Sequence, residues 1–155
     1  MTCSVSVSTG TVPAAPGNHN PAGPVSSPIS APTYSSCTSS MAGVTPTVTT
    51  SGAWQVSMQN GAPITATMTV PAGGLVLKTS GLAACTVVAA PTAAASVPGA
   101  WANGAPPSLT FTNASVPVKV TGGFGCPTSA TSSTFNAVYT VADTTDPAQQ
   151  ITVAP

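Results

Sequence analysis

Few residues in this chain could do chemistry: four cysteines, one histidine and two aspartates. The cysteines, Cys3, Cys37, Cys85 and Cys126, are widely spaced and contain no C-x-x-C pair, which argues against zinc sites and thioredoxin-like motifs. A reactive thiol needs a nearby cation or helix N-terminus to lower its pKa, and neither is visible around Cys126. We therefore expect the cysteines to serve as crosslinks.

Four cysteines allow three disulfide pairings. We expect Cys3 with Cys37 and Cys85 with Cys126, because each bridge would then join neighbouring strands across one long loop. Disulfides persist in oxidising compartments, so the pairing predicts a secreted, extracellular protein. No signal peptide precedes Cys3, which predicts that Met1 is an initiator placed on a mature fragment.

The remaining candidates for catalysis are isolated. His19 stands in "PGNHNPAG", and a histidine base needs a nucleophile and an orienting acid close by. Asp143 and Asp146, in "VADTTDPAQQ", are expected to be turn residues, with a weak Ca²⁺ site as the alternative. We predict no catalytic residue and no cofactor, and hence a protein that is not an enzyme.

The low charge excludes one class of partner. Charged residues make up 3% of the chain, which contains two lysines, Lys78 and Lys119, and no arginine. Nucleic-acid binding needs several cations on one face. The most apolar window, residues 82–101, is interrupted by Pro91 and Pro98 and makes a poor membrane-spanning helix. We therefore expect a protein that binds no nucleic acid and does not span a membrane.

Apolar and polar residues alternate with a period of two, which is typical of strands. The clearest examples are "TCSVSVS", "AWQVSM" with a core Trp54, and "ITATMTV". Asn60-Gly61 predicts a type I′ hairpin turn between the last two. Further strands are predicted over residues 44–50, 74–78, 84–90, 108–112, 116–121, 134–142 and 149–153. About ten short strands predict one all-β domain over residues 1–155, an antiparallel β-sandwich of immunoglobulin-like or jelly-roll-like type.

Two segments break the alternation. Residues 9–32 are rich in proline and glycine and predict a long surface loop, and residues 91–107 predict a second loop around Trp101. Long loops in small domains are often functional. For Trp101 two interpretations remain open, an exposed aromatic that contacts a ligand and an ordinary structural residue. The candidate binding residues are Trp101, Asn103, Tyr34 and His19.

Three phrases, "TCSVSVSTG", "YSSCTSSMAGVTPTVTTSGAWQVS" and "VPVKVTGGFGCPTSATSSTFNAVYTV", resemble small secreted proteins of high-GC Gram-positive bacteria. Those proteins are rich in threonine and serine and disulfide-bonded. The resemblance implies an extracellular β-sandwich with no known activity.

Two functions follow as expectations. The first is a noncatalytic secreted structural or cell-surface-associated protein that contacts itself or a cell-envelope component, since a near-zero net charge favours association. The second is an extracellular binding module for a carbohydrate or a small apolar ligand, since such pockets are mostly apolar with a few polar groups.

Overall fold

The alternating pattern folds into strands along almost the whole chain. The computed structural model describes residues Met1–Pro155 and contains no helix. Its eleven strands are β1 (Thr2–Val7), β2 (Val25–Ile29), β3 (Thr33–Thr38), β4 (Val44–Thr50), β5 (Trp54–Gln59), β6 (Thr65–Val70), β7 (Leu75–Gly81), β8 (Cys85–Ala89), β9 (Ala95–Ala102), β10 (Ser108–Gly122) and β11 (Ser132–Thr140). The predicted all-β class is confirmed.

Every strand pair is antiparallel. Nine strands form one sheet, in which eight follow the order β2-β5-β6-β9-β10-β8-β7-β4 and β11 pairs with β10. Strands β1 and β3 form a separate two-stranded sheet. No helix here is long and apolar enough to cross a membrane.

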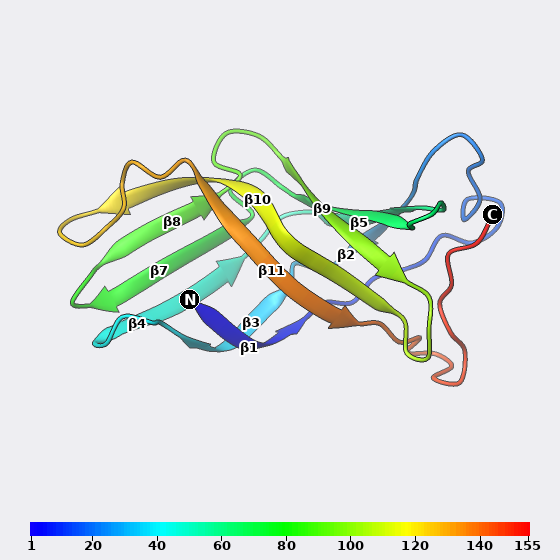
Figure 1. Cartoon of the computed structure of the whole chain (residues 1–155), viewed down its shortest axis with the longest axis horizontal. Coiled ribbons are helices and arrows are strands. Elements are labelled where there is room, and N and C mark those ends of the chain that lie inside the picture. Colours follow the sequence, from blue (N-terminus) through cyan, green and yellow to red (C-terminus); the bar gives the residue numbers. More distant parts are fainter.

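Strand β10 belongs to two groups of strands. Its first residues, Ser108 to Thr110, pair with β9, and its last five, Val118 to Gly122, pair with β8. A bulge lies between Phe111 and Ala114. A bulge bends its strand and increases the local twist. The groups β9-β6-β5-β2 and β8-β7-β4 therefore diverge from β10 in a sandwich-like arrangement (Figure 1).

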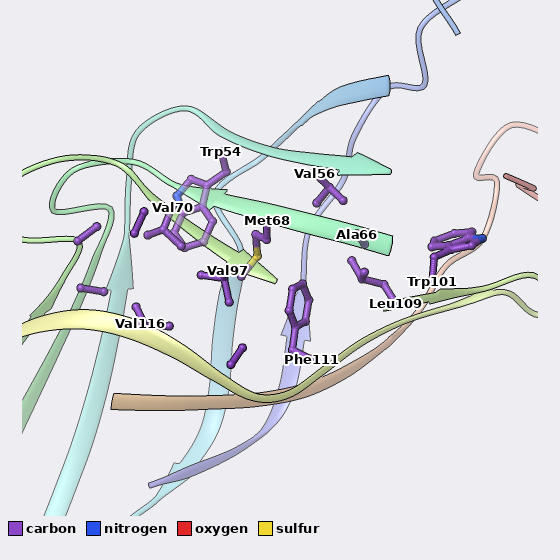
Figure 2. Close-up of a cluster of buried hydrophobic side chains, with 14 residues drawn as sticks. Trp54, Val56, Ala66, Met68, Val70, Val97, Trp101, Leu109, Phe111 and Val116 are labelled. Carbon is purple, nitrogen blue, oxygen red and sulfur yellow. The ribbon is translucent and has the colours of Figure 1, made fainter. Parts of the chain in front are cut away.

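The main core lies between these groups. Its largest fully buried side chains include Trp54, Phe111 and Val97. Figure 2 shows Trp54 and Met68 approaching from the β5–β6 side and Phe111 and Val116 from β10. The ring of Phe111 also packs against Phe135 and Tyr139 of β11, with ring centroids 5.3 and 6.3 Å away. Tilted and edge-on aromatic pairs of this kind add to the stabilisation from burial.

The β1–β3 sheet packs against this body with hydroxyl groups. Ser6 Oγ lies 3.0 Å from the hydroxyl of Tyr139 on β11, and Thr50 Oγ1 donates to the Pro32 carbonyl at 2.7 Å. The valines of β1, Val5 and Val7, are about half exposed instead. The apolar face of "TCSVSVS" is thus turned outward.

The predicted disulfides are confirmed. Cys3 and Cys37 are bonded across β1 and β3, where they are direct register partners. Cys85, at the start of β8, is bonded to Cys126 in the loop after β10. No cysteine is free.

Two predicted loops contain strands. The predicted loop over 9–32 includes β2 at its end, and β2 pairs with β5. The predicted loop over 91–107 was largely wrong, because β9 occupies Ala95–Ala102 and lies between β6 and β10. At Pro98 β9 has only β6 as a neighbour, since β10 pairs only with Ala100 to Ala102. Proline is tolerated there as it is on an edge strand.

Other local predictions also need correction. The predicted strands 108–112 and 116–121 are one strand, β10, and the predicted strand over 149–153 is irregular. Strands β5 and β6 pair as expected, but Gln59 pairs with Thr65, so residues 60–64 form a longer connection and Asn60-Gly61 does not make a two-residue turn. Pro46 lies on β4, an edge strand, where the missing N–H of a proline is tolerated.

Candidate functional site

The divergence of the two strand groups leaves an apolar cleft beside the core that is partly open to solvent. Its volume is about 150 Å³, and fourteen of its sixteen lining residues are hydrophobic. One wall comes from β4, β7 and β8 and the other from β5, β6 and β9, with β10 and β11 between them. The lining residues include Val48, Trp54, Met68, Leu75, Leu77, Val87, Val97, Val118 and Phe135.

This cleft is large for a domain of this size. Protein interiors pack as densely as organic crystals and hold few voids larger than a water molecule. An engineered apolar cavity of about 150 Å³ stays dry and binds benzene or xenon. The cleft therefore has the size and chemistry to hold one small apolar molecule.

One tyrosine of the small β1–β3 sheet contributes to the cleft. Tyr34 of β3 lines the cleft, and its neighbours are Ser6 of β1 and Tyr139 of β11. Burial, followed by the nearby Tyr139 hydroxyl, raises the pKa of Tyr34 above its ordinary value of 10.0. The Tyr34 hydroxyl therefore keeps its proton above the pH at which an ordinary tyrosine ionises. Among the candidate binding residues expected from the sequence, Tyr34 is the one at this cleft.

Trp101 is a structural residue. It lies in β9, is only 4% exposed, and its indole Nε1 donates to Asn103 Oδ1 at 2.8 Å. The interpretation of Trp101 as an exposed aromatic that contacts a ligand was wrong.

Asn103 holds the C-terminal segment. Its Nδ2 donates to the Val153 carbonyl at 2.8 Å, and the Val153 N–H donates to its Oδ1 at 2.9 Å. The Asn103 side chain thus uses both ends of its amide within the fold, which leaves it little capacity for a ligand.

His19 lies at a second, open hollow of about 710 Å³. The hollow is formed by the 9–32 segment, the end of β5 and residues 151–155, and its polar lining includes Asn18, Asn20, Gln59 and Asn60. None of its lining residues is phenylalanine, tyrosine or tryptophan. It offers amides for hydrogen bonds, and its one ring is the imidazole of His19.

The aspartates act in turns. Asp143 Oδ1 accepts hydrogen bonds from the Thr145 N–H at 2.7 Å and the Asp146 N–H at 3.1 Å, and these bonds lower the pKa of Asp143. Asp146 Oδ1 accepts from the Ala148 N–H in the same way. No group of three or more His, Cys, Asp or Glu side chains is placed to hold a metal ion.

Comparisons with protein-family models, with curated proteins and with solved structures found no match to this chain. The sequence indicated Trp54 as a core residue but not that it lines a cleft, because the opposite wall comes from strands distant in the chain.

The position of Tyr34 predicts a pH dependence of stability. Above about pH 10 the unfolded chain loses the Tyr34 proton while the folded chain keeps it, so the folded state binds more protons. Between pH 10.0 and the raised folded pKa, this difference lowers the free energy of unfolding by about 1.4 kcal/mol per pH unit. The Tyr34→Phe variant removes this contribution.

Urea unfolding of the wild-type protein and of Tyr34→Phe, at neutral pH and above pH 10.0, measures this contribution to the free energy of unfolding. We expect the stability curve of the wild-type protein to fall more steeply with pH than that of Tyr34→Phe, because only the wild-type protein has the Tyr34 hydroxyl to ionise. Parallel curves would contradict the buried position of the hydroxyl.

Proposed function

We propose that this protein is a noncatalytic, secreted binding module that holds a small apolar molecule with one polar group in the cleft. The observation that carries the proposal is the apolar cleft, whose lining includes Tyr34 and the two polar residues Ser133 and Thr134. Ligand pockets share this composition, with an apolar lining and a few polar groups that fix orientation. Of the two functions expected from the sequence, the cleft favours the binding module.

Two further observations support a secreted location and a noncatalytic role. Both disulfides are formed, and such bonds persist in oxidising environments outside the cytoplasm. All four thiols serve as crosslinks, and the imidazole of His19 has amides rather than acids beside it. These residues fit a protein that binds without transforming its ligand.

Benzyl alcohol and toluene are suitable probes, because each has one ring and only the alcohol carries a hydroxyl. Trp54 lines the cleft, so its fluorescence should change when either probe binds, and the melting temperature should rise. We expect Tyr34→Phe to weaken benzyl alcohol binding about fivefold, since one hydrogen bond contributes about 1 kcal/mol, and to leave toluene binding unchanged.

A matched pair of variants locates the binding. Val87 lines the cleft, whereas Val88 is on the opposite face of the same strand and pairs with Lys119. Val87→Phe should abolish binding of both probes and Val88→Phe should preserve it. Binding that survives Val87→Phe, or a wild-type protein that binds neither probe, would contradict the proposal.

A specific feature of β11 favours a second candidate, the self-assembling structural protein. Strand β11 pairs only with β10, so its outer edge is open, and it contains neither a proline nor a charged residue. Native proteins usually protect such edges with these residues. Val138, in the same strand, is 71% exposed.

A single charge on this strand tests the candidate. If β11 edges pair between copies, the wild-type protein should form assemblies at physiological salt, and Val138→Lys should leave monomers. Val7→Lys, on exposed β1, serves as the control and should not change assembly. Light scattering would rule out the candidate if the wild-type protein stayed monomeric at every concentration.

A further inference from the structure

Three loops meet at one end of the molecule, and each exposes one large apolar side chain. Met41 lies in the β3–β4 connection, Leu82 in the β7–β8 connection and Phe124 in the β10–β11 connection. Their exposed fractions are 52%, 75% and 97%. We call these three side chains the apolar tip.

Contacts between the loops hold the apolar tip together. The Leu82 N–H donates to the Gly43 carbonyl at 3.0 Å, which joins the first two loops. A Cβ placed on Gly125 would lie 3.3 Å from the Cβ of Ala83, and the Cys85–Cys126 disulfide bonds the same two loops covalently. The loops are therefore fixed side by side at the left end of Figure 1.

The positive and negative charges lie at different ends of the molecule. Lys78 precedes the end of β7 by three residues and Lys119 precedes the end of β10 by three, which places both about 10 Å behind the tip. Both side chains are exposed, and the pairing register puts them on one face of the sheet, opposite the cleft. Asp143 and Asp146 follow β11 at the other end of the molecule (Figure 1).

We propose that the apolar tip inserts into the interfacial region of an anionic lipid surface. Apolar side chains enter such an interface by about 5–10 Å, and basic residues just behind them meet the phosphates. The tip and the two lysines have this spacing, and the aspartates are held away from the negative surface. The proposal is independent of the cleft, which opens between the sheets.

The size of the apolar tip argues for lipid over a folded protein partner. Stable protein interfaces bury about 1,200 Å² or more over a complementary patch of 20–30 residues a side. Three side chains on the ends of loops provide no such patch. A lipid surface needs no complementary shape, only exposed apolar groups and a favourable charge.

Co-sedimentation with lipid vesicles tests the proposal. The probes are vesicles of phosphatidylcholine alone and vesicles with equal parts of phosphatidylcholine and phosphatidylglycerol. We expect the protein to bind the anionic vesicles more tightly, and to lose affinity as salt screens the lysines. Lys78→Gln with Lys119→Gln should weaken binding to the anionic vesicles about fivefold or more and should not change binding to the neutral ones.

The apolar contribution has its own matched control. Leu82→Ser with Phe124→Ser should lower the partition coefficient on both kinds of vesicle roughly tenfold or more. Val138→Ser removes an equally exposed apolar side chain far from the tip, 71% against 75% for Leu82, and should leave binding unchanged.

We expect these variants to remain folded, because the substituted side chains are exposed, and circular dichroism checks this. The proposal is overturned if the wild-type protein does not bind vesicles, if Val138→Ser weakens binding as much as the tip variants, or if the tip variants abolish self-association instead.

Discussion

The structure depends on one strand that changes partners. Over its first residues β10 pairs with β9, over its last five it pairs with β8, and the bulge between Phe111 and Ala114 bends it in between. Because the strand is continuous, the two groups of strands that it joins cannot close fully against each other. The core is sealed near Phe111, where the aromatic rings of β11 pack, and stays open as a cleft between Val97 and Leu77.

The same constraint arranges the surface. Strand β10 runs nearly the full length of the molecule, so the loops at its two ends belong to opposite poles (Figure 1). The Cys85–Cys126 disulfide fixes one pole, with Leu82 and Phe124 exposed, and the Asp143 turn occupies the other. The few charges of the chain are therefore separated, with the lysines near one end of the molecule and the aspartates at the other.

Local alternation predicted most of the strands and the disulfides. Strands β4, β5 and β6 agree with the sequence prediction because their alternation is uninterrupted, and each depends only on neighbouring residues. Strand β9 was missed because it contains Pro98. Proline is tolerated there because β10 pairs with β9 only from Ala100 onward, and this pairing depends on the tertiary structure. Strand β10 was divided in two because Asn113 and its neighbours have the composition of a turn, whereas they form a bulge within the strand.

The candidate site was much less predictable. Residue type alone made Tyr34 and Trp101 equal candidates, yet one lines a cleft and the other is buried with its indole bonded to Asn103. The difference lies in which strands surround each residue, and the residues that line the cleft come from nine separate strands. The periodicity of the sequence identifies which side chains face the interior. It cannot show that the inward faces of two groups of strands stay apart and leave a cleft between them.

The central claim is that this gap is a real, ligand-sized space beside the core, and a crystal of the protein pressurised with xenon tests it most directly. Xenon enters dry apolar cavities of this size. We predict a xenon site between Val97 and Leu77, with the surrounding side chains unmoved. A crystal in which the two walls touch and no xenon binds between them would contradict the account.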